Sequence, residues 1–200
     1  MERFVVLEGV AAPLDRSKVD TDQILPARFL RRPRKEGYAQ FLFRDWRDDP
    51  GFVLNRDAFR AARILVADRN FGGGSSREQA PWALADYGIR CVIAADFGDI
   101  FYANALKTGV LPVVLEARVC QALRGALHAR PGARMRVDLP AQAVTAPDGA
   151  TYPFAIDPFH KQCLLEGLDD VGITLQHEAA IAAFESRYRQ RFGWLFHGNV

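Results

Sequence analysis

Residues 64–115 alternate short apolar runs with helix-forming segments, and this alternation constrains the fold more than any other feature of the sequence. Three runs are rich in apolar and β-branched residues, which is typical of buried strands: 64–67, 89–94 and 110–115. The helical patterns between them stop at Gly88 and Gly109, a residue type favoured just after a helix. This spacing predicts parallel strands joined by right-handed crossovers.

A different pattern follows residue 116. Residues 117–129 predict a helix that Pro131 and Gly132 end. Three short strands come next, the last two joined by Pro-Asp-Gly and therefore expected to form a hairpin: 134–139, 142–146 and 151–156. Asp157, a suitable N-cap, precedes a helix that ends near Gly167. A final helix places four side chains on one face: His177, Ile181, Phe184 and Tyr188.

The first sixty residues are irregular. Residues 1–8 predict a short strand, and loops rich in proline follow it. Aromatic residues among these loops indicate that they pack against the rest of the chain: Tyr38, Phe41, Phe43 and Trp46. At 200 residues the chain is long enough for one domain with a sizeable core. The sequence therefore predicts a single α/β domain over residues 1–200, with a mixed, partly parallel sheet.

A glycine-rich segment, Asn-Phe-Gly-Gly-Gly-Ser-Ser-Arg-Glu-Gln, occupies residues 70–79. It stands between the carboxyl end of a predicted parallel strand and a helix, where open α/β sheets bind ligands. Glycines let a ligand approach the backbone closely, and a helix N-terminus favours a carboxylate or phosphate. Arg77 can add a bidentate grip on a carboxylate. The segment is therefore a candidate anion site.

The same segment also has a purely structural interpretation. It fits two capping boxes, which open many helices without any ligand: Ser75 with Glu78, and Ser76 with Gln79. Pro81 requires either an irregular first turn or a helix that begins just before it. The segment lacks the last glycine of a dinucleotide-binding fingerprint and the lysine of a P-loop, so neither nucleotide motif is present.

Two other places carry polar candidates. Asp20 and Asp22 lie in a Val-Asp-Thr-Asp stretch ahead of Pro26 and could orient a base or hold a partner. Spacing alone favours a simple aspartate turn there. Asn104 lies on the helix predicted after residue 99, and the four histidines form no ligand pattern.

Composition narrows the partners and the compartment. A net charge of +2 argues against nucleic acid or membrane as the main partner, and the basic residues at 28–35 indicate a solvated loop or a rim that attracts small anions. The start is too short and too acidic for a signal peptide. Three cysteines, far apart and without a Cys-x-x-Cys pair, predict buried free thiols, a cytoplasmic protein and no metal site on this chain.

Taken together, these segments resemble the small subunit of 3-isopropylmalate dehydratase, a family similar to the mobile swivel domain of aconitase. The resemblance runs almost end to end and keeps its order. It is carried by the following stretches: 19–22, 41–47, 52–55, 70–72, 74–78, 80–88, 99–102, 167–169 and 174–177.

The resemblance implies an aconitase swivel-type β/β/α domain. The implied reaction is hydro-lyase chemistry that isomerises 2-isopropylmalate to 3-isopropylmalate in leucine biosynthesis. The implied partner is a large subunit that carries a 4Fe–4S cluster, with no cofactor on this chain. The implied substrate is a small hydroxy-dicarboxylate.

Site residues follow from the same resemblance. Ser75 is implied as the general base, Ser76 as a hydrogen-bonding group and Arg77 as the group that holds a substrate carboxylate. Asp22 matches an active-site aspartate, and Gly74 belongs to the substrate-binding loop. A serine hydroxyl is a poor base in water, so it needs a helix N-terminus, a cation and backbone donors to stabilise its anion.

The substrate is left open by three departures from the family pattern: Gly73 in place of cysteine, Gln79 in place of histidine and Ala105 in place of serine. The loop at 27–32 is where the family selects the substrate's side group, and Phe29 and Leu30 could face an isopropyl group. The alternatives are a methylmalate/citraconate or homoaconitate type of dehydratase, or a non-catalytic module that binds an anion.

Overall fold

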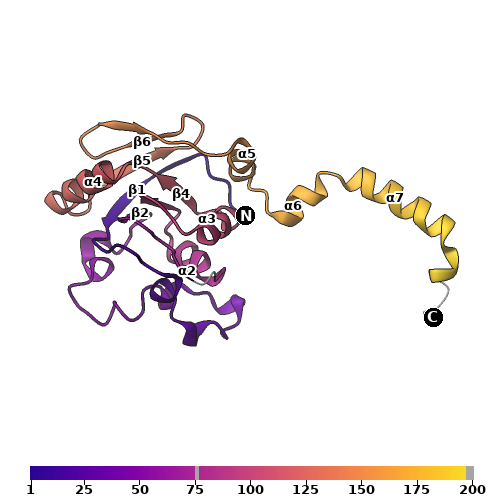
Figure 1. Cartoon of the computed structure of the whole chain (residues 1–200), viewed down its shortest axis with the longest axis horizontal. Helices are drawn as coiled ribbons and strands as arrows, with labels where there is room; N and C mark the ends of the chain where they lie inside the picture. The colour runs from indigo at the N-terminus through magenta and orange to yellow at the C-terminus, as the bar shows by residue number, and fades with distance from the viewer. Residues whose placement is uncertain (75–76, 197–200) are drawn as a thin grey trace.

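A mixed sheet forms the centre of the chain in this computed structural model, which describes residues 1–74 and 77–196 (Figure 1). Its strands are β1 (Val6–Pro13), β2 (Ile64–Val66), β3 (Cys91–Ala94), β4 (Leu111–Val114), β5 (Arg134–Asp138), β6 (Ala143–Thr145) and β7 (Thr151–Pro153). Their order across the sheet is β4-β3-β2-β1-β5-β6-β7. Strands β4 to β1 pair in parallel, and β1 to β7 pair antiparallel, which confirms the predicted mixed sheet and hairpin.

Strand β1 joins the two halves of the sheet and departs from the predicted bounds. We expected a strand at 1–8, whereas β1 spans Val6–Pro13. Its first half pairs antiparallel with β5, and Ala11 and Ala12 then pair in parallel with Ile64 and Leu65. Strand β1 must therefore be long enough to pair with β5 along its first half and with β2 at its end. This length depends on tertiary contacts, which the local pattern of residues 1–8 does not contain.

The helices between the parallel strands match their predicted positions closely. Gly88 and Gly109 both end a helix in the left-handed conformation, as predicted. The predicted N-cap at Asp157 is also confirmed, since its side chain accepts from the Phe159 and His160 backbone N–H groups. The helices are α1 (Thr21–Ile24), α2 (Gln79–Tyr87), α3 (Asp99–Thr108), α4 (Ala117–Ala129), α5 (Pro158–Glu166), α6 (Asp170–Leu175) and α7 (Glu178–Arg191).

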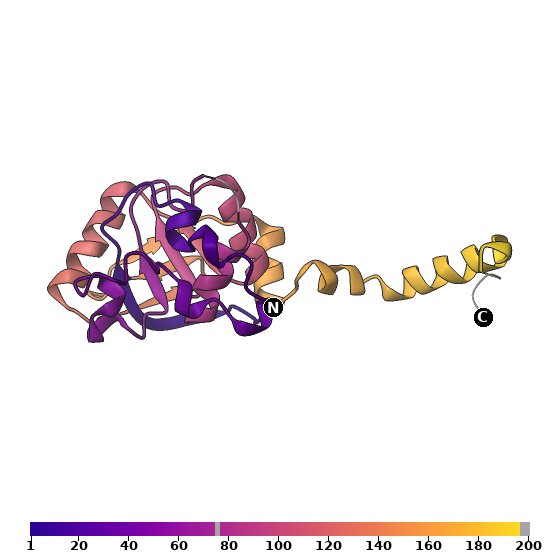
Figure 2. The ribbon, with the colours of Figure 1, turned by 90° about the horizontal axis from the view of Figure 1, so that it is seen from below.

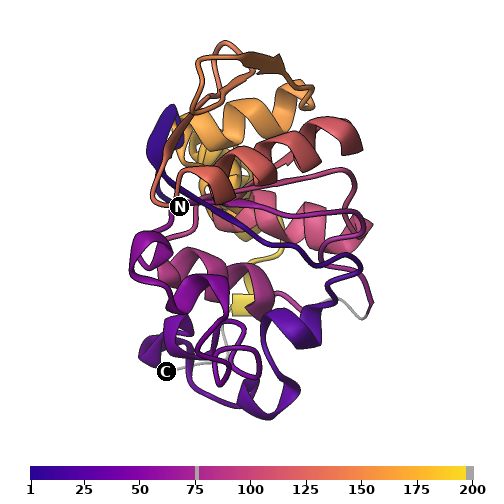
Figure 3. The ribbon, with the colours of Figure 1, turned by 90° about the vertical axis from the view of Figure 1, so that its left-hand side faces the viewer.

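Side-chain alternation along the central strands builds a core on each face of the sheet. Leu65 and Val92 pack with helix α2 and the N-terminal third of the chain. Their neighbours Ile64 and Val66 point the other way and pack with α4 and α5. In Figure 3 the N-terminal segment and α2 accordingly lie at one side, and α4 and α5 at the other.

The N-terminal third packs against the first of these cores, as its aromatic residues predicted. Tyr38 and Phe43 are fully buried, and Phe43 stacks on Trp46 with ring centroids 5.2 Å apart. Its backbone forms short 3-10 turns: η1 (Ala27–Phe29), η2 (Arg34–Glu36), η3 (Ala39–Phe41), η4 (Val53–Asn55) and η5 (Asp57–Phe59).

The C-terminal segment stands away from the rest of the chain (Figures 1 and 2). Helix α6, which we had not predicted, leads into α7 and a last 3-10 turn, η6 (Gly193–Phe196). Three residues of the predicted helical face, Ile181, Phe184 and Tyr188, lie on α7 and are all exposed. The fourth, His177, precedes the helix as its N-cap. Within residues 1–74 and 77–196, no helix is both long and apolar enough to cross a membrane.

Candidate functional site

Two loops run side by side from the carboxyl ends of β1 and β2. Backbone hydrogen bonds continue the pairing of the strands beyond the sheet. Lys18 N–H donates to Arg69 O over 2.9 Å, and Gly72 N–H donates to Val19 O over 2.6 Å. The Thr21 N–H then donates to Gly73 O over 3.1 Å. The segment 19–22 and the described start of the glycine-rich segment, 70–74, are therefore neighbours.

The first loop presents its aspartates at the start of α1. Asp20 is the N-cap, and its carboxylate accepts from the Gln23 backbone N–H over 2.7 Å. The Gln23 side chain returns a bond to the Asp20 backbone, which completes a capping box. Asp22 lies in the first turn of the helix, half-exposed, and faces the second loop. The stretch is thus a capped helical turn rather than a simple aspartate turn.

The second loop is held by close contacts at its glycines. Gly72 has φ +75°, and a Cβ on it would lie 2.1 Å from Phe101 Cγ on α3. A Cβ on Gly98, in the loop between β3 and α3, would lie 2.5 Å from Gly72 O, so the backbone of this third loop lies against that of the glycine-rich loop. The predicted residue Gly74 has φ +83° and lies beside Asp20, since a Cβ added to this glycine would lie 3.4 Å from Asp20 Cβ. Only glycine suits this path at Gly72.

Arg77 and Asp22 form an ion pair between the two loops. The Arg77 Nε lies 3.2 Å from Asp22 Oδ1, with the arginine side chain 25% exposed and the aspartate 49% exposed. Although this distance is short, the buried Nε–H makes no hydrogen bond among the described residues. The ion pair with Asp22 orients the guanidinium. Because a guanidinium has five N–H donors, it still has donors for a further carboxylate.

Helix α2 begins later than the capping boxes predicted. Its first residue is Gln79, and Glu78 takes the N-cap position without a side-chain cap. The observed start agrees with the alternative in which the helix begins just before Pro81. Pro81 lies in the first turn, where its missing N–H costs no helical bond, and this resolves the conflict that it posed. Ser75 and Ser76 themselves lie outside the described residues.

Phe29 and Leu30 lie on the turn that follows α1. The Phe29 ring stacks on Phe41 with centroids 4.3 Å apart, and the Arg28 guanidinium covers it at 4.7 Å. Both predicted residues are partly buried against the first core. Among the described residues, no hydrogen bond, ion pair or ring contact joins either residue to Arg77 or Asp22, and the ring contact of Phe29 is to Phe41.

The basic stretch at 28–35 is largely paired with carboxylates. Arg28 binds Asp45, and Arg34 forms a bidentate pair with Asp86 at 2.7 and 2.9 Å. The neighbouring guanidinium raises the acidity of Asp45, so that the pKa of this carboxyl is below its usual value. Pairing leaves less positive charge for the predicted anion-attracting rim.

The three departures from the family pattern fall in different surroundings. A Cβ on Gly73 would lie 3.0 Å from Asn70 Oδ1, so the Asn70 side chain fills the space beside this glycine. Gln79 is half-buried at the start of α2. Ala105 is fully buried among core residues. The departure at position 105 therefore places its side chain in the core and not at the surface of the two loops.

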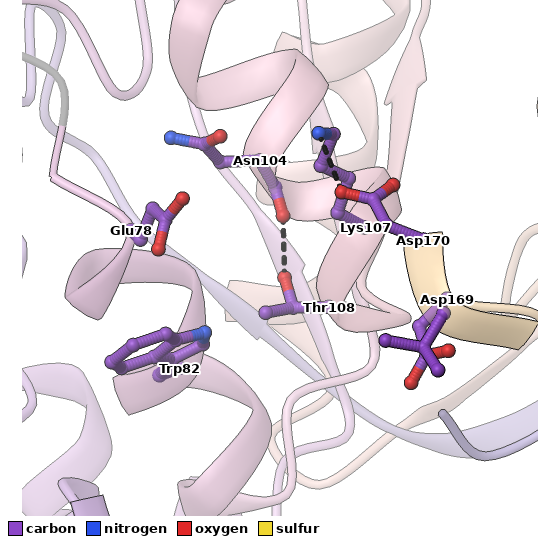
Figure 4. A pocket seen from close by; sticks show the side chains of 8 residues that line it. Glu78, Trp82, Asn104, Lys107, Thr108, Asp169 and Asp170 are labelled. Atoms are coloured by element: carbon purple, nitrogen blue, oxygen red, sulfur yellow. Dashed lines mark hydrogen bonds and ion pairs between the residues drawn. The ribbon is translucent and has the colours of Figure 1, made fainter. Parts of the chain in front are cut away.

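A cavity of about 240 Å³ lies between α2, α3 and α6 (Figure 4). Asn104, the third sequence candidate, lines it, and so does Glu78, the residue after Arg77. An ion pair between Lys107 and Asp170, 3.0 Å long, closes one side. Its other lining residues are Trp82, Thr108, Asp169 and Val171.

The cysteines do not suit an iron–sulfur cluster on this chain. All three are free and buried, as predicted: Cys91, Cys120 and Cys163. Burial raises the pKa of the Cys91 thiol and raises that of Cys120 to about 11, which disfavours the thiolate that a cluster needs. Among residues 1–74 and 77–196, no group of three histidine, cysteine or acidic side chains could hold a metal ion.

Comparison with known families and proteins covers nearly the whole chain. The Aconitase C-terminal domain family matches residues 1–118, a LeuD_N model matches 121–158, and the C-terminal domain of the 3-isopropylmalate dehydratase small subunit matches 170–198. A 3-isopropylmalate dehydratase small subunit from Magnetococcus marinus is 47% identical, covering 98% of this chain and 99% of that relative. The chain belongs to the 3-isopropylmalate dehydratase small-subunit family. Another member, from Xanthobacter autotrophicus, is 50% identical over 98% of this chain and 100% of its own.

A solved member of the family has the same fold. The crystal structure of 3-isopropylmalate dehydratase from Methanocaldococcus jannaschii superimposes with a TM-score of 0.69 at 25% identity. The match covers 90% of this chain and 99% of that one. The predicted family and the aconitase-type α/β fold are both confirmed.

Arg124 is a part of the site region that the sequence analysis missed. It lies on the face of α4 that also carries the buried residues Cys120, Leu123 and Leu127. A charged arginine at a buried helical position needs polar partners, so its place on the apolar face of a predicted helix was a sequence signal that could have singled it out. The spacing of residues along the helix does not say where those partners are.

Proposed function

We propose that this chain is the small subunit of a hydro-lyase that isomerises 2-isopropylmalate to 3-isopropylmalate by dehydration and rehydration, a step of leucine biosynthesis. The proposal covers residues 1–200 as one swivel-type unit, active only with a large subunit. The near-full-length identity of 47–50% to small subunits of that name supports the reaction. The free, buried thiols are compatible with a cytoplasmic enzyme.

The observation that carries the proposal is the Arg77–Asp22 pair at the carboxyl ends of the parallel strands. It presents a half-buried guanidinium beside a glycine-rich loop, where a dicarboxylate can approach the backbone. In this proposal Arg77 holds a substrate carboxylate, and Asp22 fixes the orientation of the guanidinium. Gly74 leaves room for the substrate at the backbone.

Ser75 and Ser76 complete the proposed machinery, on the basis of the family resemblance. Ser75 removes the proton from the carbon next to the one that loses its hydroxyl, and returns it on rehydration at the alternative position. Ser76 donates hydrogen bonds to the substrate. The positive charge of Arg77 and the N-terminus of α2 favour the anionic form of a neighbouring base.

The proposed partner is a large subunit that carries a 4Fe–4S cluster. When bound to the large subunit, such a cluster would supply Lewis-acid chemistry for the loss and return of the hydroxyl. The buried cysteines of this chain do not suit such a cluster. This agrees with a division of labour in which this chain contributes the base and a carboxylate-binding arginine.

Substrate choice is tested by assaying the reconstituted pair on 2-isopropylmalate and on citraconate, side by side and without oxygen. We expect a higher kcat/KM for 2-isopropylmalate. Turnover of citraconate alone would identify the enzyme as a methylmalate/citraconate type of dehydratase. The departures from the family pattern at Gly73 and Gln79 leave this alternative open. A stable pair with an intact cluster and no turnover of either compound would favour the non-catalytic anion-binding module.

Replacing Leu30 with arginine is expected to lower kcat/KM for 2-isopropylmalate about tenfold or more, because a charge would replace an apolar contact for the isopropyl group. The half-buried position of Leu30 makes the change possible without a fully buried charge. The measurement compares 2-isopropylmalate with citraconate, whose methyl group needs less apolar surface. An equal kcat/KM for wild type and variant would remove Leu30 from the specificity site.

A further inference from the structure

We propose that Arg124 is a positioning residue that holds the two site loops against each other at their root. It lies on α4, far along the chain from both loops, and it is only 9% exposed. Its role would be to fix the separation between the strand ends from which the Asp22 loop and the Arg77 loop emerge. Only its effect on catalysis rests on the function proposed above.

The contacts of Arg124 join the ends of the two strands. Its Nε donates to Asp15 Oδ1 over 3.0 Å, and Asp15 follows β1. One terminal nitrogen donates to Ala67 O over 2.7 Å, and the other lies 3.7 Å from Asp68 Oδ2. Ala67 and Asp68 follow β2. His128, one turn further along α4, also contacts Asp15. A planar guanidinium thus spans both loop roots at once.

The loops depend on this spacing because most of their mutual contacts lie in sequence beyond the residues that Arg124 contacts, a set of bonds that we call the clamp. The Leu14 N–H donates to Val66 O over 2.8 Å just before the clamp, and the bonds at Lys18, Gly72 and Thr21 follow it. The Arg77–Asp22 ion pair lies at the far end of this series. A buried arginine with fixed partners resists separation of the loops, because opening them would leave its charge unpaired in the interior.

Arg90 provides a matched control at the opposite, N-terminal ends of the parallel strands. It too is buried, at 8% exposure, and it pairs with a carboxylate, Glu2. Its Nε donates to the Gly109 carbonyl over 3.0 Å. It precedes β3 and contacts neither loop root in any described bond. Losing Arg90 therefore tests general destabilisation without touching the clamp.

The test is amide hydrogen exchange of the full-length chain, comparing Gly72 and Thr21, whose N–H groups link the loops, with Ile93 in β3 as the internal reference. In Arg124→Met we expect the loop amides to exchange about tenfold faster relative to Ile93. Arg124→Lys keeps the positive charge but loses the planar guanidinium with its several donors, so it should give a smaller increase in the exchange rate. Arg90→Met should leave the ratio unchanged.

An unchanged ratio in Arg124→Met, or an equal rise in Arg90→Met, would overturn the proposal. Normalising to Ile93 separates local opening from lower global stability. In the assembled enzyme, Arg124→Met should also lower kcat/KM about 10²-fold, as expected for groups displaced by about 1 Å, with partial recovery in Arg124→Lys. A chain without dehydratase activity would still show the exchange effect, so failure of the proposed function and failure of the clamp are distinguishable.

Discussion

Replacing Ser75 with alanine is expected to lower kcat of the assembled enzyme by about 10²- to 10⁴-fold, the range typical for loss of a general base. The KM for 2-isopropylmalate should change little, because Arg77 would still hold a substrate carboxylate. The proton on the substrate carbon is only weakly acidic, so its removal depends on a base held beside it. Steady-state kinetics of wild-type and variant complexes measure the effect.

Ser76→Ala is the matched control, because it removes a hydroxyl from the adjacent residue. We expect it to lower kcat/KM by only about tenfold, since the cost is one hydrogen bond to the substrate. Cluster content and subunit association are measured for both variants. Equal losses of kcat in the two variants would contradict a special role for Ser75. Full activity of Ser75→Ala would exclude Ser75 as the base.

Gly72→Ala is expected to lower the free energy of unfolding by about 2–4 kcal/mol. The left-handed backbone at φ +75° costs about 1 kcal/mol for alanine, and overpacking adds about 1–3 kcal/mol. The overpacking arises because the new Cβ would lie 2.1 Å from Phe101 Cγ, whose ring is itself buried. Denaturant unfolding followed by circular dichroism measures the difference.

Gly88→Ala separates the two causes of this effect. Gly88 also has a positive φ, +106°, but nothing lies within 4 Å of a Cβ built on it. Its substitution should therefore cost only about 1 kcal/mol from backbone strain. If the two alanine variants proved equally stable, the close packing of the glycine-rich loop on α3 would not contribute.

Local sequence signals predicted the parallel half of the sheet well. Gly88 and Gly109 marked the ends of α2 and α3, and the helix predicted at 117–129, before Pro131 and Gly132, has the bounds of α4. The signals failed where tertiary contacts decide the structure. Strand β1 extends beyond its predicted end because it must reach β2, and no local pattern contains that demand.

The candidate site was predicted in parts, but its assembly was not. The sequence singled out Asp22 and Arg77 separately, and their ion pair depends on the parallel pairing that brings two distant loops together. Helix α2 begins only at Gln79, close to Pro81, and the capping boxes of Ser75 and Ser76 stay predictions because these serines lie outside the described residues. Arg124 was overlooked, since the partners that explain its burial belong to loops far away in the sequence.

The most direct measurement is turnover of 2-isopropylmalate by the cluster-loaded large subunit, under anaerobic conditions, with and without this chain. We expect 3-isopropylmalate to form only when the chain is present, because the proposed base and the carboxylate-binding arginine belong to it. Equal turnover by the large subunit alone, or none by a stable pair with an intact cluster, would contradict the proposal.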